Sequence, residues 1–306
     1  MPVKIPASLP AVDMLLRENI FVMDNHRADA QDIRPLRIVI LNLMPLKIVT
    51  ETDLLRLLSN SPLQIELDLI VPSGHTSRNT PQEHLDAFYK EFDNIRNNNY
   101  DGMIITGAPV EHLDFNQVDY WNELTDIFDW AYTHVTSTLH ICWAAVAALH
   151  HRYGIPKRML DKKRFGVFAT QQVDNNHNPL FRGFDDIFYV PNSRHCEVFR
   201  EDIEKEKALT LLSYSDDCGV HIAMARGGRD FYILGHSEYA PYTLDTEYRR
   251  DLALGLPIEP PLNYYRDDNP DNEPIVRWRS HGNLLFSNWL NYFVYQLTPY
   301  DLNKIR

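Results

Sequence analysis

The chain has 306 residues, 44% of them hydrophobic, so it can bury a substantial core as one large domain or two modest ones. A formal net charge of −12 excludes a general nucleic-acid role, which needs a basic field, but it leaves room for a local cationic site for an anionic ligand. The cysteines lack metal-type spacing, and we see neither a signal peptide nor an apolar run of the ~20 residues that a membrane span needs. We therefore expect a soluble cytoplasmic protein with no metal, no nucleic acid and no membrane partner.

The N-terminal region, residues 1–35, contains four prolines and mixed apolar spacing. We predict that it forms an arm that wraps around the rest of the chain, and it is a candidate for a subunit contact. No Gly/Ser linker marks a boundary further along the chain. We therefore predict that residues 36–306 form a single α/β domain.

The first half of the chain alternates predicted strands and helices. In order they are a strand over 36–41, a helix opened by Thr50, Glu51 and Asp53 that runs through Leu58, a strand over 63–70, a helix from the Thr80–Glu83 capping box to about Asn94, a strand over 101–107, a helix over 121–134 and a strand ending at Cys142. This alternation predicts a doubly wound, mostly parallel α/β sheet. Ligands of such a sheet bind at the carboxyl ends of its strands, where the loops after Leu41, Thr106 and Ile141 meet.

The second half has a different pattern. Strands are predicted over 164–173, 187–190, 209–214, 220–226 and 230–234, a helix over 245–254, and a terminal helix over 284–297. The pair Gly227-Gly228 is typical of a hairpin turn, so we expect a late antiparallel hairpin. The aromatic stripe of the terminal helix indicates core or dimer contact, because aromatic faces are usually buried.

The stretch Ser137 to Ala145 is the strongest functional signal. An apolar, β-branched run ends at Cys142, and the strong helix former Trp-Ala-Ala-Val-Ala-Ala-Leu follows at once. We expect this helix to stop at Tyr153, because Gly154 and Pro156 are stop signals. A strand that turns directly into a helix at a nucleophilic residue is a nucleophile elbow. The N–H groups of the first helical turn then face whatever the sulfur attacks, and they favour negative charge there. The alternative is a buried cysteine packed under the sheet.

His236 is the best candidate for the base that Cys142 needs. It closes a predicted strand, and Glu238 follows two residues later, on the same side of the strand. A carboxylate on one ring nitrogen leaves the other free as base or acid. The alternative is a strand-end histidine beside a surface acid, because His-x-Glu alone is a weak motif.

Other chemistries have less support. No Cys-x-x-Cys or His-Glu-x-x-His occurs, which argues against zinc, and no glycine-rich repeat indicates a nucleotide site. An oxyanion hole needs two donors. We expect the backbone N–H of Trp143 to be one and the loop from Leu43 to Leu46 to supply the other, with Lys47 as a positive charge nearby; the alternative for Lys47 is solvated surface.

Several blocks resemble the homoserine O-acyltransferase family of methionine biosynthesis. They are His-Ile-Cys-Trp-Ala-Ala, Gly-His-Ser-Glu-Tyr, Thr-Gly-Ala-Pro-Val-Glu, Asn-Leu-Met-Pro-Leu-Lys and Trp-Arg-Ser-His-Gly-Asn-Leu-Leu-Phe-Ser-Asn-Trp-Leu-Asn-Tyr. The likeness covers about the whole chain. It implies a flavodoxin-like fold similar to class I glutamine amidotransferases, with a Cys-His-Glu triad.

The resemblance also implies roles for particular residues. Cys142 matches the acyl-thioester nucleophile, His236 the proton acceptor and Glu238 its partner. The substrate-binding positions match Lys163, Ser193 and Arg250. An arginine can hold the carboxylate of a free amino acid with two hydrogen bonds. The alternative for the cations is exposed surface, and Lys162 and Arg249 are neighbours of like type.

Glu111 stands at the position that the resemblance links to the acyl donor. Glycine there is associated with succinyl transfer and glutamate with acetyl transfer. A carboxylate in the acyl pocket would repel the free carboxylate of a succinyl group by several kcal/mol, using an effective dielectric constant of roughly 20 and a separation of about 4 Å. The alternative is a glutamate on the loop surface.

The resemblance therefore predicts acetyl transfer from acetyl-CoA to the hydroxyl of L-homoserine through an acyl-enzyme on Cys142, with His236 neutral when it acts as base. Acetyl-CoA is a co-substrate, no cofactor is expected, and a homodimer is expected. Three alternatives stay open: a succinyltransferase using succinyl-CoA, a hydrolase or amidotransferase with the same triad, and a sensor without catalysis.

Overall fold

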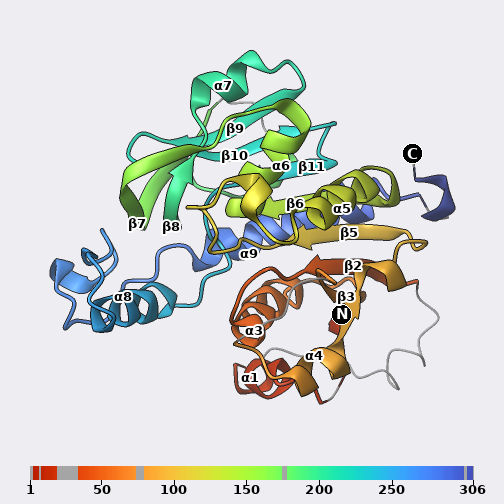
Figure 1. Cartoon of the computed structure of the whole chain (residues 1–306), viewed down its shortest axis with the longest axis horizontal. Helices are drawn as coiled ribbons and strands as arrows, with labels where there is room; N and C mark the ends of the chain where they lie inside the picture. Colours follow the sequence, from red (N-terminus) through yellow and green to blue (C-terminus); the bar gives the residue numbers. More distant parts are fainter. Residues whose placement is uncertain are drawn as a thin grey trace.

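The computed structural model describes residues 3–6, 8–18, 34–73, 79–173, 178–299 and 302–305, so part of the predicted arm lies outside the described residues. Within these residues eleven strands form one sheet, in the order β1-β3-β2-β5-β6-β11-β10-β9-β7-β8, with β4 paired to β3. Figure 1 shows the sheet running through the molecule with helices on both of its faces. The described part of the chain contains no helix long and apolar enough to cross a membrane.

The parallel part of the sheet comes mostly from the first half of the chain. Its strands are β1 (Val3–Lys4), β2 (Leu36–Leu41), β3 (Ile65–Val71), β4 (Tyr89–Glu91), β5 (Tyr100–Ile105), β6 (Val135–Ile141) and the later β11 (Asp230–Ile233). β5 and β6 are buried along their whole length, as expected of central parallel strands rich in β-branched and aliphatic residues. Their carboxyl ends meet at one edge, which confirms the predicted doubly wound fold.

The antiparallel part is larger than the single hairpin that the sequence predicted. It comprises β7 (Arg158–Gln172), β8 (Ile187–Glu197), β9 (Leu209–Ser215), β10 (Gly219–Ala225) and β11. The hairpin between β10 and β11 is present, and Gly227 and Gly228 at its turn both have positive φ angles. β7 begins six residues earlier than expected and β8 ends seven residues later, because the two strands pair with each other over their polar segments.

Helices cover both faces of the sheet. The main helices are α1 (Ala11–Arg17), α3 (Lys47–Leu58), α4 (Gln82–Phe88), α5 (Trp121–His134), α6 (Trp143–Tyr153), α7 (Arg200–Lys205), α8 (Thr243–Ala253) and α9 (Arg279–Asn288). Shorter turns are η1 (Phe92–Asn94), η2 (Phe115–Gln117), η3 (Pro179–Phe181), η4 (Arg266–Asp268), η6 (Leu302–Lys304) and the π-helical η5 (Trp289–Tyr295). Helices α5 and α6 share one buried core with the sheet, while α1, α3, α9 and η5 share another on its opposite face.

Two predicted helices differ from the observed ones. Helix α3 begins at Lys47, three residues before the predicted start at Thr50. The helix predicted from Thr80 to Asn94 ends at Phe88, because Tyr89–Glu91 pairs with β3 as an extra edge strand. The predicted capping box is absent as well, since the Thr80 hydroxyl donates to the carbonyl of Pro45.

The terminal helix carries most of its aromatic stripe inside the protein. Phe286, Trp289 and Phe293 are buried in the core beneath the sheet, whereas the Tyr295 side chain is exposed. The sequence predicted either core or dimer contact for this stripe, and these three aromatic residues lie in the core.

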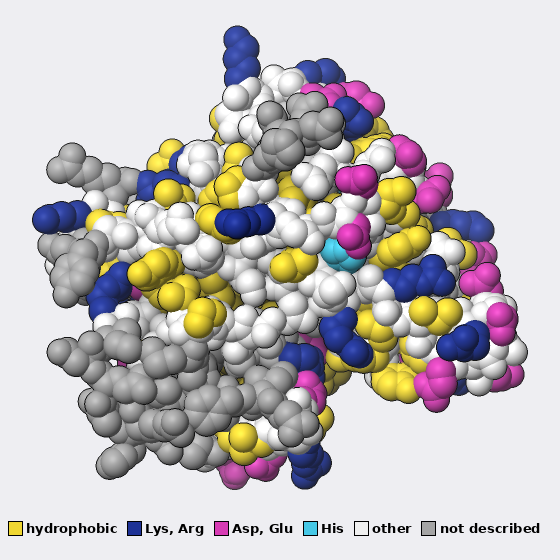
Figure 2. Space-filling model, turned by 180° about the vertical axis from the view of Figure 1, so that it is seen from behind, with side chains coloured by type: hydrophobic (Ala, Val, Ile, Leu, Met, Phe, Trp, Pro, Cys, Tyr) yellow, Lys and Arg dark blue, Asp and Glu magenta, His cyan; other side chains and the backbone are white. Residues whose placement is uncertain are grey.

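Helix α8 lies on a lobe with its own small core. Leu244 and Tyr248 of α8 pack there with Tyr264, Trp278 and Phe165 of β7. The lobe projects from the body in Figure 1, and the view from behind in Figure 2 shows hydrophobic side chains on it among acidic and basic ones. Three leucines at the end of α8 and just after it are 50–67% exposed: Leu252, Leu254 and Leu256.

Candidate active site

Cys142 lies at the junction between β6 and α6. Its backbone has φ 52° and ψ −117°, a conformation that non-glycine residues rarely adopt. The strain is held by the strand on one side, where the Cys142 N–H donates to Ile233 O at 2.7 Å, and by the helix on the other, where Ala145 N donates to Cys142 O at 3.0 Å. The predicted elbow is therefore observed, and α6 ends at Gly154 in the left-handed conformation, as predicted.

His236 and Glu238 lie beside this elbow and contact each other. His236 Nδ1 is 2.6 Å from Glu238 Oε1, and the ring also makes a hydrogen bond with the Cys142 side chain. This contact between His236 and Glu238 does not arise from the predicted alternation along a strand. β11 ends at Ile233, and both residues lie in the loop that follows it. The His236 N–H donates to Pro191 O at 2.8 Å, and the Tyr239 ring stacks on the imidazole with centroids 4.2 Å apart.

The charge state of His236 depends on its neighbours. Burial disfavours the imidazolium, but the facing Cys142 and the Glu238 carboxylate outweigh this effect and raise the pKa of His236 well above its ordinary value. The imidazolium is therefore favoured while negative charge remains on the sulfur. The other two cysteines are also buried, and burial raises the pKa of both Cys196 and Cys218.

The backbone around Cys142 offers donors for an oxyanion. As the first residue of α6, Trp143 has no acceptor for its N–H within the helix. Two N–H groups of the predicted second donor loop bind other acceptors, since Leu43 N donates to Thr106 Oγ1 and Met44 N donates to Asn42 Oδ1. Gly107, which the sequence reasoning missed, lies next to the cysteine: a Cβ added there would be 3.2 Å from Cys142 Cβ.

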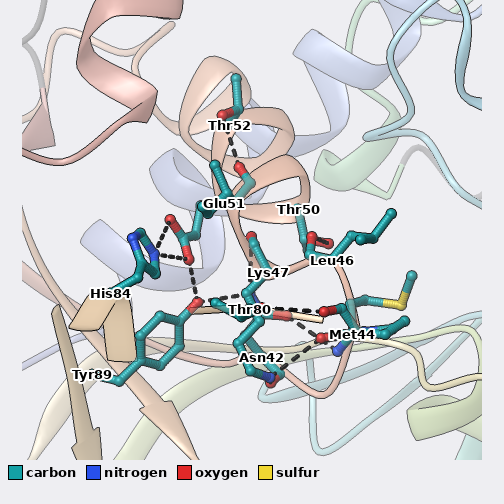
Figure 3. A network of polar contacts seen from close by, with 12 residues as sticks. Asn42, Met44, Leu46, Lys47, Thr50, Glu51, Thr52, Thr80, His84 and Tyr89 are labelled. Carbon is teal, nitrogen blue, oxygen red and sulfur yellow. Dashed lines mark hydrogen bonds and ion pairs between the residues drawn. The ribbon is translucent and has the colours of Figure 1, made fainter. Parts of the chain in front are cut away.

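Lys47 is buried within its own loop instead of extending toward the sulfur. Its ammonium donates to Asn42 O at 2.7 Å and to Met44 O at 3.2 Å. Figure 3 shows that it belongs to a polar network in which Glu51 accepts hydrogen bonds from His84 and Tyr89. Burial lowers the pKa of Lys47 to about 8, partly offset by Glu51. Lys47 therefore stabilises the loop after β2, and its burial contradicts the predicted alternative of a solvated surface lysine.

The three predicted substrate residues converge on an acid that the sequence reasoning missed. Glu247 of α8 lies 2.6 Å from Lys163 Nζ of β7, 2.7 Å from Ser193 Oγ of β8 and 3.8 Å from Arg250 Nη2. Lys163 and Arg250 also contact Asp251. A carboxylate beside three donors suits an amino-acid substrate, whose ammonium needs an acid. The spacing of Glu247 and Arg250, three residues apart on one helix face, was the available signal.

Lys162 and Arg249, the neighbours of like type, lie elsewhere. Lys162 pairs with Glu259 at the surface, and Arg249 pairs with Asp245. The cations that contact Glu247 are therefore Lys163 and Arg250, and not Lys162 or Arg249.

Glu111 is only 8% exposed, and it lies near enough to both His236 and Lys163 for their charges to act on its carboxylate. Its Oε1 accepts the backbone N–H of His195 at 3.3 Å. Burial raises the pKa of Glu111, while His195, His112, His236 and Lys163 act in the opposite direction. The predicted alternative of a surface loop residue is therefore wrong, because this carboxylate faces the candidate site.

A second buried acid lies near Glu238. Asp53 of α3 accepts a hydrogen bond from Arg56 at 2.8 Å and another from the Ala240 N–H, close to the Glu238 carboxylate. Burial raises the pKa of Asp53 to about 6 although Arg56 favours its charged form. Arg56 in turn binds Glu18, so a chain of polar contacts connects the end of α1 to the turn that carries Glu238. Nothing in the sequence signalled this contact.

The fold is shared with solved structures of low sequence identity. A glutamine amidotransferase from Thermotoga maritima aligns over 84% of this chain and 98% of its own, with a TM-score of 0.55 and 14% identity. A glutamine amidotransferase from Methylobacillus flagellatus aligns over 85% of this chain and 95% of its own, with a TM-score of 0.52 and 10% identity. The chain therefore has a class I glutamine amidotransferase-like fold.

The family follows from sequence comparison. A profile described as homoserine O-succinyltransferase matches residues 2–300, and the chain belongs to this family. Similar relatives named homoserine O-acetyltransferase include those of Bacteroides thetaiotaomicron, 66% identical, and Acetivibrio thermocellus, 58% identical, with 100% of each chain covered.

Proposed function

We propose that this protein is a homoserine O-acetyltransferase, which transfers the acetyl group of acetyl-CoA to the hydroxyl of L-homoserine and releases O-acetyl-L-homoserine and CoA. The observation that carries the proposal is the 58–66% identity, over whole chains, to relatives of that name. The product is the activated homoserine that the family resemblance links to methionine biosynthesis. The geometry around Cys142 supports an acyl-enzyme route.

In the first step the Cys142 sulfur attacks the thioester carbonyl carbon of acetyl-CoA. The carbonyl oxygen becomes an oxyanion beside the N–H of Trp143 and the backbone of Gly107, which contacts the cysteine. When the intermediate collapses, the bond to the CoA sulfur breaks, and the departing sulfur takes the proton of the His236 imidazolium. The products of this step are acetyl-Cys142, CoA and a neutral imidazole.

In the second step neutral His236 accepts the proton of the homoserine hydroxyl as its oxygen attacks the acetyl-cysteine. Acetylation has by then removed the negative charge from Cys142, and this charge is one cause of the raised His236 pKa. The histidine thus becomes a base when one is needed. Collapse of the second intermediate expels the Cys142 thiolate, which His236 again faces as an imidazolium. Glu238 keeps the ring oriented through Nδ1.

The cluster on α8 supports the binding of a free amino acid. Arg250 suits the homoserine carboxylate, since its side chain is more than half exposed and a guanidinium binds carboxylates with two hydrogen bonds. Glu247 suits the ammonium group, with Lys163 and Ser193 holding its carboxylate in place. The hydroxyl of the bound substrate then extends toward the acetyl-cysteine.

The acetyl donor is proposed on the basis of Glu111. Its buried carboxylate faces the site, and a succinyl group would bring a second carboxylate toward it. At about 4 Å and an effective dielectric constant of about 20, the repulsion is roughly 4 kcal/mol. The alternative function is a homoserine O-succinyltransferase, which the description of the family profile favours.

Steady-state kinetics with L-homoserine and each of the two acyl-CoA donors tests the proposal. We expect a clear preference for acetyl-CoA and, in Glu111→Gly, a gain of succinyl-CoA activity. A wild-type preference for succinyl-CoA would refute the proposal that Glu111 selects acetyl-CoA as the donor. Mass spectrometry after acetyl-CoA alone should find acetyl on Cys142 and none in Cys142→Ala. Turnover of glutamine without CoA would instead indicate a hydrolase or amidotransferase.

We also propose a cytoplasmic homodimer. All three cysteines are free, in keeping with a reducing compartment. The exposed leucines at the end of α8 are an apolar surface of the kind that subunit contacts use. Sedimentation equilibrium measures the mass in solution, and a monomer mass at working concentration would refute the dimer.

A further inference from the structure

Lys157 makes contacts that its position in the sequence did not suggest. It follows α6 by four residues and is half-buried. Its ammonium donates to the backbone carbonyl of Glu111 at 2.7 Å and also to the carbonyl of Leu113. The same nitrogen lies 5.1 Å from the centre of the Phe115 ring. One cation therefore contacts three residues of the segment that carries Glu111.

These contacts connect Glu111 to the helix that carries the nucleophile. Helix α6 starts next to Cys142, and the chain leaves it through Gly154 and Ile155, whose N–H donates to Leu149 O. Ile155 is buried in the core, and only Pro156 separates it from Lys157, which allows little movement. The segment from the end of α6 to Lys157 thus fixes the position of Glu111 relative to the Cys142 sulfur.

The Glu111 carboxylate has a second anchor. Its Oε1 accepts the N–H of His195, and the His195 ring packs against His112 with centroids 4.6 Å apart. The backbone of Glu111 is bound from one side by Lys157 and its side chain from the other by β8. Both anchors are needed to fix the carboxylate, because rotation of the backbone would redirect the side chain even with the His195 contact present.

We propose that Lys157 is a positioning residue for acyl-donor selection, which holds the Glu111 carboxylate where it excludes the larger, charged acyl group. The inference rests on the proposed function and adds to it the residue through which Glu111 acts. Lys157 itself contacts neither the reacting atoms nor the homoserine cluster. Loss of its ammonium frees the carbonyls of Glu111 and Leu113, and the carboxylate then samples positions that leave space for a succinyl group.

The test compares Lys157→Met with wild type by the ratio of kcat/KM for acetyl-CoA to that for succinyl-CoA. Methionine keeps an apolar stem and removes the charge and the donors. We expect the ratio to fall about tenfold, with the KM for homoserine changed less than twofold. Lys162→Met is the matched control, because Lys162 pairs with Glu259 at the surface and should leave the ratio unchanged. If Lys157→Met does not fold, Lys157→Gln is measured in its place.

A double-mutant cycle with Glu111→Gly separates positioning from a general effect. If Lys157 acts through Glu111, adding Lys157→Met to Glu111→Gly should leave the ratio unchanged. An equal fall in both backgrounds, or an unchanged ratio in the single variant, would overturn the proposal while acetyl transfer by wild type stands. Failure of wild type to use either donor would instead refute the proposed function, and the role of Lys157 in donor selection with it.

Discussion

Gly282→Ala tests whether the contact between α9 and the turn after His236 controls activity, apart from any effect of helix propensity on stability. It lies in α9, buried against the backbone of Ser237, the residue between His236 and Glu238. A Cβ built at Gly282 would be 2.5 Å from the Ser237 carbonyl oxygen, and real Cβ contacts essentially never fall below 3.0 Å. Gly282→Ala therefore has to push α9 and the turn apart by about 0.5 Å or more.

Two effects of opposite sign follow from this substitution. Alanine in a helix interior is favoured over glycine by about 1 kcal/mol, while overpacking a rigid contact costs about 1–3 kcal/mol. The free energy of unfolding should therefore be unchanged or lower by up to about 2 kcal/mol. The shift falls on the turn that positions His236 and Glu238, where a misplacement of about 1 Å costs on the order of 100-fold. We expect kcat to fall by about 10–100-fold.

The assay follows both half-reactions. CoA release from acetyl-CoA in the absence of homoserine reports acylation, and full turnover reports both steps. Ser280→Ala, on an exposed position of the same helix, is the control for propensity and should retain wild-type kcat. A Gly282→Ala protein with higher thermal stability and unchanged kcat would show that α9 yields freely, and the reasoning from this contact would be wrong.

Three further predictions concern the networks around the site. Tyr89→Phe removes a hydroxyl donor from buried Glu51 and should lower the free energy of unfolding by about 1.5–3 kcal/mol, measured by urea denaturation; an unchanged midpoint would contradict the role of this network. Gly228→Ala should be strongly destabilising, because the position has φ 97° and an added Cβ would be 2.1 Å from Phe293 Cδ1. A melting temperature equal to wild type would argue against this. Because burial raises the pKa of Glu111, its charge is complete at alkaline pH and is lost on acidification sooner than that of an ordinary glutamate. The preference for acetyl-CoA should therefore weaken as pH falls, and a ratio of kcat/KM values constant with pH would refute this.

The sequence predicted best those elements whose ends are decided locally. The bounds of β2, α5 and α6 match the prediction, because an apolar run or an Ala-rich helix followed by a glycine needs no distant partner. The helix from Thr80 failed where β3 recruited Tyr89–Glu91 as an edge strand, which is a tertiary contact. Similarly, β7 and β8 extend over polar residues only because they pair with each other.

The same distinction holds around the candidate site: features that depend on neighbouring residues were predicted, and features that depend on distant contacts were missed. The elbow at Cys142 and the nearness of His236 to Glu238 are visible in short motifs. Glu247 was missed because its partners come from β7 and β8, more than 50 residues away in the chain. The burial of Lys47 was missed because a lysine after an exposed-looking turn gives no sign that two carbonyls of its own loop surround it.

We propose that residues other than Cys142, His236 and Glu238 determine which reaction this protein catalyses. A thiolate, an imidazole and a carboxylate on this fold are compatible with amide hydrolysis and with acyl transfer alike. What favours transfer to an amino-acid hydroxyl is the acid on α8, which suits an ammonium group, and what favours a small neutral acyl group is the buried carboxylate of Glu111. Both residues lie outside β6 and α6. Substitutions at Glu247 should therefore act on homoserine and those at Glu111 on the donor, while acetylation of Cys142 continues in both.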